Sequence, residues 1–589
     1  MRIARRQRQC RLQDADDNDA ELPPLLRRIY ENRNVRTRGE LDYSLKHLHP
    51  PARLKGIAEA SALLQHALDA EQRILIIGDY DADGATATAV ALLGLRALGA
   101  RRVEYLVPNR FEYGYGLSAR IAEVALAKRP QLVITVDNGI SSIDGVAVLR
   151  AGGVAVIVTD HHLAGEQLPA ANAIVNPNQP GCDFPSKGLA GVGVMFYLLL
   201  ATRARLRESG WFSRTGDAAP NLAELLDLVA LGTVADMVPL DHNNRILVAQ
   251  GIARTRAGEC RPGIEALLQV AGRARARLVA SDFGFVVAPR INAAGRLDDI
   301  STGIECLLAP DRAQADEHAR RLDEMNAQRR RIEQSMQQQA LEIVARIEQS
   351  NDDAERRGWC LFDPAWHQGV VGRVASRIAE TSGQPAIAFA PARDGMLSGS
   401  ARSVEGLHIR DLLESISMRH PDLIERFGGH AMAAGLTLAQ ARLSTFAEAF
   451  AERVGAHFAE HPPGAQILTD GELAAEEFTL EMAELMRTAA PWGQRFPAPL
   501  FDGAFRVTAQ RVVGERHLKM KLAQLDGARS FDAIAFGQVE PGDDAAPLDA
   551  VRAAYQLEAN EYRGRVSLQL LVKHLEPCAA DERHASDAT

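Results

Sequence analysis

The sequence predicts a multidomain α/β protein with a doubly wound parallel-sheet domain, a long connecting helix, a smaller second domain and a C-terminal β-barrel. Three observations lead to this fold class. Short apolar runs that end in acids alternate with Ala- and Leu-rich helical stretches across residues 73–160. A polar stretch near 310–350 carries apolar residues at helical spacing, and short alternating strands follow residue 500. The chain has 589 residues, whereas one hydrophobic core rarely serves more than about 250–300 residues.

The first predicted strand lies in residues 73–84, RILIIGDYDADG. A run of four β-branched or leucine residues closed by glycine is typical of a buried strand in a parallel sheet. The acids Asp79, Asp81 and Asp83 follow, where open α/β sheets bind their ligands. Three close carboxylates repel one another unless a cation neutralises them, so a hard divalent metal is favoured. Taken alone, the segment fits a solvated acidic turn equally well.

The same pattern occurs twice more along the chain. The apolar run LVITV leads to Asp137, and the run VAVIV leads to Asp160, His161 and His162. A single acid after a strand is usually a helix cap or a turn residue. Three such strand ends close together in the sequence favour a shared metal site. The alternation of strands with helices predicts a doubly wound parallel sheet.

Two further residues of this region each allow two interpretations. Asp236 lies in the apolar stretch GTVADMV after a predicted helix at 222–231. A buried carboxylate needs a partner, which a metal would supply, although a helix cap is the alternative. Arg110 lies in PNRFEYGYG, after a predicted strand at 103–107. The residues alone favour a surface loop with a packed aromatic over a phosphate-binding loop.

The second half of the chain begins with a predicted amphipathic connector. Leu322, Met325, Ile332 and Met336 recur at three- or four-residue steps or their multiples, among Arg, Gln and Glu. The run Arg329–Arg331 on this helix is more typical of a solvated face than of a binding site.

Beyond a Pro-containing linker at 460–465, alternating strands predict an OB-fold-like barrel. In one of them Lys519 and Lys521 share a face opposite the apolar side chains, and this basic face favours nucleic acid. Any small barrel alternates in the same way, so the basic face decides the interpretation. The expected strands are 505–513, 517–522, 531–536, 555–561 and 566–574.

Composition limits the possible partners and the compartment. The net charge is −9, so a nucleic acid would have to be met by a local basic groove. The six cysteines contain no C-x-x-C pair, which argues against a zinc ribbon or disulfide framework and indicates a reducing cytoplasm. The basic residues 1–17 lack the apolar core of a secretory signal, and the apolar run 194–201 is too short to span a bilayer. We therefore expect a cytoplasmic protein without a membrane contact.

The motifs GDYDADG, VDNG, TDHH and GTVADMV, in this order, resemble those of the DHH phosphoesterase superfamily, which is named for the triplet at 160–162. More closely, the chain is similar to the RecJ family of single-strand-specific DNA exonucleases. The resemblance covers residues 40–577. Its further motifs are APRINAAGR at 288–296, WHQGVVG at 366–372, SGSARS at 398–403 and GGHAMAAG at 428–435.

The resemblance implies two Mn²⁺ or Mg²⁺ ions at the acidic strand ends. In this family-based interpretation Asp137 bridges the ions, Asp160 orients His161 by accepting its second ring N–H, and His162 contacts the scissile phosphate. Two metals can activate water and stabilise both the attacking and leaving oxygens of an in-line displacement. The expected ligands are Asp79, Asp81, Asp83, Asp137, His161 and Asp236.

The resemblance also implies contacts to the substrate. Residues 288–296 would be a substrate loop of the metal domain, with Arg290, Asn292 and Arg296. Ser400, Arg402 and His430 lie in Gly-rich surroundings that suit anion contact. The expected pocket for a terminal 5′-phosphate, which would set the polarity, consists of Arg110, Arg290, Ser400 and Arg402.

The function that the resemblance implies is a 5′→3′ exonuclease that acts on single-stranded DNA and releases 5′-mononucleotides in recombination and repair. A single-strand-binding protein and a helicase are candidate partners, and a monomer is expected. The alternatives are a DHH phosphoesterase for short oligonucleotides or pyrophosphate, which needs no C-terminal barrel, and an inactive binding or scaffold protein, which needs no clustered acids. The expected divisions are a DHH catalytic domain with its lead-in at 1–310, a connecting helix at 311–354, a small α/β DHH-associated domain at 355–458, an OB-fold-like DNA-binding domain at 466–577 and a disordered tail at 578–589.

Overall fold

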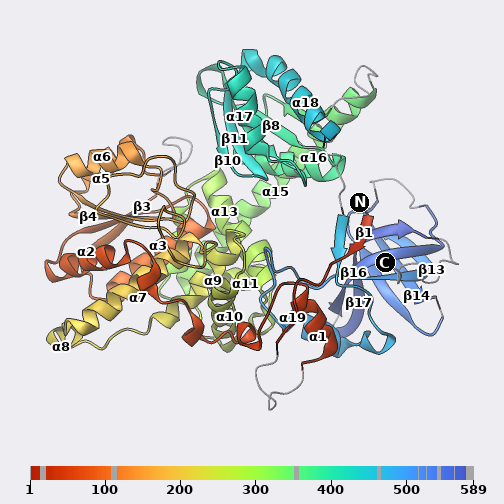
Figure 1. Ribbon diagram of the computed structural model, residues 1–589, viewed down its shortest axis with the longest axis horizontal. Helices are drawn as coiled ribbons and strands as arrows, with labels where there is room; N and C mark the ends of the chain where they lie inside the picture. The colour runs from red at the N-terminus through yellow and green to blue at the C-terminus, as the bar shows by residue number, and fades with distance from the viewer. Residues whose placement is uncertain are drawn as a thin grey trace. The chain divides into compact units, whose positions relative to one another are not determined.

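The computed structural model divides the chain into two compact units (Figure 1). One unit holds Met1–Gly295, Asp299–Arg320 and Gln466–Thr589, and the other holds Arg296–Asp298 and Arg321–Ala465. Residues 461–465 of the linker expected at 460–465, and residues 579–589 of the tail expected at 578–589, lie outside the described residues. The structure describes residues 2–13, 22–107, 116–349, 357–460, 466–514, 516–525, 527–539, 546–562 and 564–578.

Within the described residues, five parallel strands form the sheet of the first unit in the order β3-β2-β4-β5-β6. Helices α5 and α6 pack on one face against Leu75, Val133 and Val156. Helices α3 and α7 cover the other face (Figure 1). The side chains of β2 and β4 are therefore buried, which confirms the doubly wound parallel sheet. The bounds are β2 Ile74–Ile77, α3 Ala82–Ala97, β3 Val103–Leu106, α5 Ala119–Ala127, β4 Leu132–Val136, α6 Ile143–Ala151, β5 Ala155–Thr159, β6 Ala173–Val175 and α7 Gly191–Glu208.

Helices complete this part of the first unit. The motif at 288–296 forms helix α13 and not the loop we expected. Proline is tolerated in the first turn of a helix, and the motif buries Ile291 and Ala294 on one side. A Cβ at Gly295 would collide with the carbonyl oxygen of Tyr80, so this glycine brings α13 against the first acidic turn. The bounds are α1 Pro24–Glu31, α2 Ile57–Asp69, α8 Trp211–Thr215, α9 Leu226–Ala235, α10 His242–Ala257, α11 Pro262–Val270, α12 Ala280–Asp282, a π-helical turn Phe283–Val287, α13 Ala288–Leu297 and α14 Ser301–Leu308.

The predicted connector is helix α15, Arg312–Gln349, which runs from the first unit into the second. Leu322 and Met336 are buried on its apolar side. The solvated-face interpretation of the arginine run holds for Arg330 and Arg331 but is wrong for Arg329. Only 4% of the Arg329 side chain is exposed, and the guanidinium lies 3.6 Å from the Glu333 carboxylate.

The second unit is a small α/β domain whose described strands form a mixed sheet in the order β10-β11-β9-β8-β7. The β7–β8 pair is parallel, and the other pairs are antiparallel. Phe389, Phe446 and Phe450 lie in the core between this sheet and the helices. The bounds are β7 Trp359–Phe362, α16 Val371–Ser382, β8 Ala386–Pro391, β9 Met396–Arg402, α17 Ile409–Arg419, β10 Arg426–Gly429, β11 Ala433–Ala439 and α18 Leu443–Glu460.

The C-terminal strands close into a barrel in the order β13-β14-β15-β17-β16, which confirms the predicted barrel. Leu518, Met520 and Leu522 point into the core, whereas Lys519 and Lys521 lie on the outer face. No helix in the part of the chain that the structure describes is long and apolar enough to cross a membrane. The bounds are β13 Phe501–Val513, β14 His517–Gln524, β15 Ser530–Ala535, β16 Ala550–Tyr562 and β17 Arg565–Pro577, with β1 Arg2–Arg5 paired to β12 Gln466–Thr469 and α19 Leu480–Thr488 before the barrel.

A buried ion pair joins the lead-in segment to the region that precedes the barrel. The Arg33 guanidinium donates to both carboxylate oxygens of Asp470, at 2.8 and 2.9 Å, and the two side chains are 1% and 0% exposed. The Asn32 amide and the backbone N–H of Leu500 also donate to this carboxylate. Burial acts to raise the pKa of Asp470, but the Arg33 contacts outweigh it and hold that pKa below its usual value.

The substitution Arg33→Ala should destabilise the protein by about 3–5 kcal/mol at neutral pH, because it leaves the Asp470 charge buried without its partner. Chemical unfolding in urea measures this loss. The stability that the pair contributes is present above the unfolded pKa of an aspartate, about 3.9, and is lost as the pH falls through the depressed folded value. The difference between wild type and variant should therefore shrink below about pH 4.

Arg101→Ala is the matched control, because Arg101 pairs with Glu71 at 2.7 Å while the side chains are 76% and 53% exposed. Its expected cost is about 0–1 kcal/mol. An equal effect of the two substitutions would contradict a stabilising role for the buried pair.

Candidate metal centre

The acids predicted from the sequence converge at one edge of the parallel sheet. Strand β2 pairs with β3 on one side and with β4 on the other, so the strand order reverses beside β2. Open α/β sheets bind ligands at the carboxyl ends of strands at such a switch point. The turn after β2 carries Asp79, Asp81 and Asp83, Asp137 follows β4, and the triplet 160–162 follows β5. Asp236 is added from the carboxyl end of α9.

Asp83 is fixed by the amino-terminal end of helix α7. Its carboxylate accepts hydrogen bonds from the backbone N–H groups of Gly191 at 2.7 Å and Val192 at 3.0 Å. Burial, followed by repulsion from Asp81, raises the pKa of Asp83 to about 7, although both backbone donors oppose the shift. A Cβ at Gly191 would collide with the carboxylate of Asp137. Glycine at this position therefore lets α7 approach two carboxylates at once.

The other two acids of the first turn are also held by local hydrogen bonds. Asp81 caps helix α3 by accepting from the backbone N–H of Gly84 at 3.0 Å. Asp79 accepts from the N–H of Tyr80 at 2.8 Å and is only 4% exposed. Burial, and then the charge of Asp81, raise the pKa of Asp79 well above its usual value. Ligand atoms of Asp79, Asp81 and Asp137 all lie within 4.8 Å of one another.

Asp137 reaches this group through an unusual backbone conformation. Its φ of 61° lies in the left-handed region, which aspartate tolerates better than most residues. The next residue, Asn138, is fully buried, and its amide donates to the carbonyl oxygens of Ile77 at 3.1 Å and Val136 at 2.9 Å. These bonds tie the ends of β2 and β4 together. The Asn138 hydrogen bonds at the switch point thus hold the strained backbone of Asp137 in place.

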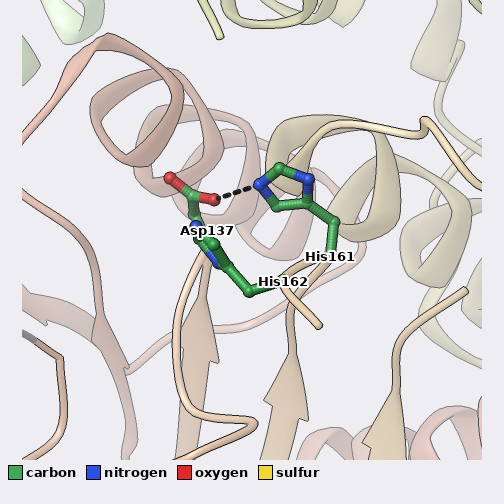
Figure 2. Close-up of side chains that lie close together, drawn as sticks. All are labelled: Asp137, His161 and His162. Atoms are coloured by element: carbon green, nitrogen blue, oxygen red, sulfur yellow. Dashed lines mark ion pairs between the residues drawn. The ribbon is translucent and has the colours of Figure 1, made fainter. Parts of the chain in front are cut away.

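His161 lies between two of the carboxylates. Its Nε2 atom is 3.2 Å from Oδ1 of Asp137 and 3.4 Å from Oδ2 of Asp236. Figure 2 shows the His161 ring turned toward the Asp137 carboxylate. Ligand atoms of Asp83, His161 and Asp236 also lie within 4.8 Å of one another. The structure therefore places the six expected ligands in two groups at this edge of the sheet, and a third group of Asp137, His161 and His162 links them.

Asp160 differs from its expected role. Its Oδ1 lies 2.7 Å from Nδ1 of His162 and accepts from the backbone N–H of His161, whereas we expected it to orient the ring of His161. The Asp160 Oδ2 accepts from the N–H of Ile140 at 2.8 Å. Burial acts to raise the pKa of Asp160, but the hydrogen bond from His162 outweighs it and lowers that pKa. Burial acts to lower the pKa of His162, but the hydrogen bond to Asp160 outweighs it and raises that pKa to about 9.

The electrostatics of this cluster fit a divalent cation. Within the described residues, Asp137 Oδ1 and Asp236 Oδ2 are buried and accept no hydrogen bond. Burial, and then neighbouring carboxylates with Asp83 first among them, raise the pKa values of Asp137 and Asp236 well above the usual range. A bound cation would reverse this penalty by favouring the charged carboxylates. Carboxylate oxygens and imidazole together suit Mn²⁺, and oxygen ligands suit Mg²⁺.

The expected substrate contacts of the first unit have structural partners of their own. The Asn292 side chain accepts a hydrogen bond from the backbone N–H of Ala82 at 2.7 Å, so it holds the start of α3. Arg290 is 7% exposed and donates to the carbonyl oxygen of Val286 at 2.6 Å. Arg110 lies outside the described residues.

The second unit carries an Arg–Ser cluster. Arg402 donates to the hydroxyl oxygens of Ser400 at 2.9 Å and Ser376 at 3.1 Å. A Cβ at Gly372 would lie 2.8 Å from Arg402 Nη2 and 2.9 Å from Ser400 Oγ, so glycine leaves this cluster its space. Burial, and then the charge of Arg373, lower the pKa of Arg402.

The remaining two expected contacts also belong to the second unit. His430 is exposed and follows β10, and its backbone N–H donates to the carbonyl oxygen of Ala433 at 2.8 Å. Arg296 donates to the carbonyl oxygen of Gly369 at 3.2 Å.

Sequence reasoning missed Gly191, Asn138 and Ser376. The small residues at the start of the apolar helix, in LAGVGV, were a usable signal for Gly191, because glycine permits close approach. Ser376 had no such signal, since only the fold brings α16 beside β9.

The first unit holds buried carboxylates and an imidazole at a sheet switch point. The second unit holds an Arg–Ser cluster of a kind that suits phosphate. Together these features define a metal-dependent phosphoesterase. Comparison with known proteins agrees with this class. The DHH family, N-terminal domain, matches residues 73–233, the DHHA1 domain matches 357–456, and the RecJ OB domain matches 469–574.

Named relatives cover nearly the whole chain. The single-stranded-DNA-specific exonuclease RecJ of Dickeya dadantii (strain 3937) is 55% identical over 94% of this chain and 96% of that protein. The Escherichia coli (strain K12) protein of the same name is 51% identical over 97% of this chain and 100% of that protein. The crystal structure of RecJ in complex with Mn²⁺ from Thermus thermophilus is similar with a TM-score of 0.76 and 31% identity, over 97% of this chain and 80% of that one. The complex with Mg²⁺ has a TM-score of 0.70 and 30% identity, over 97% and 79%. This chain belongs to the RecJ family.

The substitution Gly191→Ala should weaken Mn²⁺ binding roughly 10- to 100-fold, the loss typical when a supporting contact of a metal ligand is disturbed. The added methyl group would collide with the Asp137 carboxylate and would move the α7 amino terminus that holds Asp83. Isothermal titration calorimetry measures the affinity.

Gly193→Ala is the control, because its methyl group in the same helix would meet only the side chain of Leu189. Unchanged Mn²⁺ affinity in the Gly191 variant, or an equal loss in both variants, would contradict the close approach of α7 as the cause.

Proposed function

We propose that this protein is a single-stranded-DNA-specific exonuclease that hydrolyses phosphodiester bonds with two divalent ions, Mn²⁺ or Mg²⁺. The observation that carries the proposal is the convergence of six ligand side chains at the sheet edge of a chain that aligns with exonuclease relatives almost from end to end. The Mn²⁺ and Mg²⁺ complexes of the Thermus thermophilus relative support the choice of metals. The proposed ligands are Asp79, Asp81, Asp83, Asp137, His161 and Asp236.

Two ions held there would activate water and stabilise the charge that develops on the attacking and leaving oxygens. The protein orients the side chain that would contact the phosphate. The lowered pKa of Asp160 keeps its carboxylate an acceptor, so Nδ1 of His162 is the donor in their hydrogen bond. The Nε2 atom of His162 is then directed to contact the scissile phosphate. Asp160 is a positioning residue for His162 in this proposal.

The Arg–Ser cluster of the second unit is proposed to bind the terminal 5′-phosphate. Arg402 is held by two serine hydroxyls beside a glycine, and an Arg fork matches the oxygens of a phosphate. His430, Arg290, Arg296 and Arg110 remain proposed substrate contacts. Binding of a 5′-phosphate would impose 5′→3′ polarity and the release of 5′-mononucleotides.

The C-terminal barrel is proposed to hold the rest of the strand. Its outward Lys519 and Lys521 suit a phosphate backbone, which a bare pyrophosphate substrate would not require. We further propose a monomer that acts in the cytoplasm in recombination and repair, with a single-strand-binding protein and a helicase as partners. We also propose that the chain divides into a catalytic domain at 1–310, a connecting helix at 311–354, a DHH-associated domain at 355–458, a DNA-binding barrel domain at 466–577 and a tail at 578–589.

The substitution Asp137→Ala should reduce cleavage to background while strand binding in EDTA is retained, because it removes a carboxylate that lies close to Asp79 and Asp81 and also to His161 and His162. The assay is a product time course on single-stranded DNA labelled at its 3′ end, with Mn²⁺, Mg²⁺ or EDTA, beside a duplex. The wild type should yield a metal-dependent ladder on the single strand alone. Cleavage only of very short oligomers would instead favour the small-substrate phosphoesterase, and near-normal activity of the variant would refute the metal assignment.

The substitution Arg402→Ala should remove most of the preference for a 5′-phosphorylated end, because it deletes the guanidinium of the proposed phosphate cluster. Loss of a charged hydrogen-bond partner typically costs about 1.5–3 kcal/mol, or roughly 10- to 150-fold in kcat/KM. The ratio of kcat/KM for phosphorylated and unphosphorylated strands measures the preference. Arg410→Ala, at an exposed position of α17, should keep the wild-type ratio. An unchanged ratio in the Arg402 variant would exclude this residue from the end-binding site.

A further inference from the structure

Large apolar side chains are exposed to solvent directly after two residues of the metal centre in the sequence. Among the exposed large apolar residues that the structure describes between 22 and 310, the three most exposed are Phe285 at 72%, Leu163 at 65% and Met237 at 61%. Leu163 directly follows His162, and Met237 directly follows Asp236. Single exposed apolar residues are common in folded proteins. Here two of the three most exposed ones directly follow residues of an anionic centre, where water would otherwise be the expected neighbour.

Met237 is held outward by an unfavourable backbone conformation. Its φ is 58°, in the left-handed region that side chains other than Gly, Asn and Asp rarely adopt. Its N–H bonds the carbonyl oxygen of Val234 at 3.3 Å, which closes the last turn of α9. Conformations of this kind cost on the order of 1–3 kcal/mol and gather at functional sites. The strain carries the chain away from the helix immediately after the ligand Asp236.

Phe285 reaches the same region from another element. It lies in the π-helical turn whose first and last residues, Phe283 and Val287, are fully buried. The turn rests on the end of α9, since a Cβ at Gly284 would lie 3.1 Å from Cγ1 of Val234. Single π-helical turns inside helices occur frequently at functional sites. This one anchors its buried neighbours, packs against α9, the helix that ends at the ligand Asp236, and leaves the Phe285 ring in solvent.

We propose that Phe285, Met237 and Leu163 form an apolar platform for the nucleobase attached to the phosphate at the metal centre. A ligand that satisfies both features carries an anion for the metal side and a flat apolar face for the rim. A nucleotide does so, whereas pyrophosphate has no apolar face. Stacking on an aromatic ring accepts every base, which fits a nuclease without sequence preference. The inference rests on the proposed function and narrows its substrate to strands that bear a base at the reacting nucleotide.

The test compares a single-stranded DNA with the same strand carrying one abasic residue in its middle. Loss of one stacked base is expected to slow cleavage roughly 5- to 150-fold, so the wild-type ladder should pause at the abasic residue. Phe285→Ala should slow cleavage of the intact strand by a similar factor and leave the abasic step unchanged, so that the pause disappears. Phe285→Trp should restore the pause, and Met237→Ala should weaken it. Val124→Ala, at an exposed position of α5, should behave as wild type.

Fluorescence anisotropy in EDTA gives a readout that does not depend on catalysis. The wild type should bind a short intact strand more tightly than its abasic counterpart, and Phe285→Ala should lose this difference. A wild-type ladder without a pause, or a Phe285 variant that slows intact and abasic steps equally, would overturn the platform. A wild type that cleaves no single-stranded DNA would refute the proposed function, while the EDTA comparison would still decide the platform. If Phe285→Ala fails to fold by thermal melting, the Met237→Ala and Phe285→Trp variants decide it.

Discussion

Repulsion among buried carboxylates is the constraint on which the rest of the first unit depends. Asp79, Asp83 and Asp137 all lie at the sheet edge with 4% exposure or less, and burial raises the pKa of each. A fold can hold such a cluster only with donors around it and a cation within it. The α7 amino terminus supplies two donors to Asp83, and the glycine at 191 allows α7 to come that close. The strand order sets the position of the cluster, because at the switch point the segments after β2 and β4 lead to helices on opposite faces of the sheet.

Much of this arrangement follows from the sequence, and the exceptions have physical causes. Periodicity located the buried strands, and the acids after them converge because parallel strands end at one edge. Helix α13 was missed because Pro289 and Gly295 look like loop residues, whereas proline is tolerated in a first turn and the glycine serves a close contact. The partner of Asp160 was missed because adjacent histidines project their rings in different directions, which only the turn geometry decides. Arg329 was misjudged because Glu333, one helical turn away, compensates its burial.

Under the proposed function, two kinds of surface at the metal centre would let one site be both reactive and unselective for sequence. Its anionic interior suits cations and, through them, a phosphate. In our proposal the exposed side chains of Phe285, Met237 and Leu163 form its rim, and they offer area without directional hydrogen bonds. In the same proposal, the Arg402 cluster of the second unit would bind a strand end, and the outward Lys519 and Lys521 of the barrel would contact the phosphate backbone. Each part would then contact a feature that every nucleotide shares, namely phosphate, charge or the face of a base.

The central claim is that the strand-end carboxylates and His161 are the ligands of two divalent ions. Anomalous diffraction from crystals soaked in Mn²⁺ tests it most directly, because the manganese positions are located independently of any activity. The expected result is two anomalous peaks, both among Asp79, Asp81, Asp83, Asp137, His161 and Asp236. Peaks elsewhere in the protein, or no peak at this edge of the sheet at saturating Mn²⁺, would contradict the assignment.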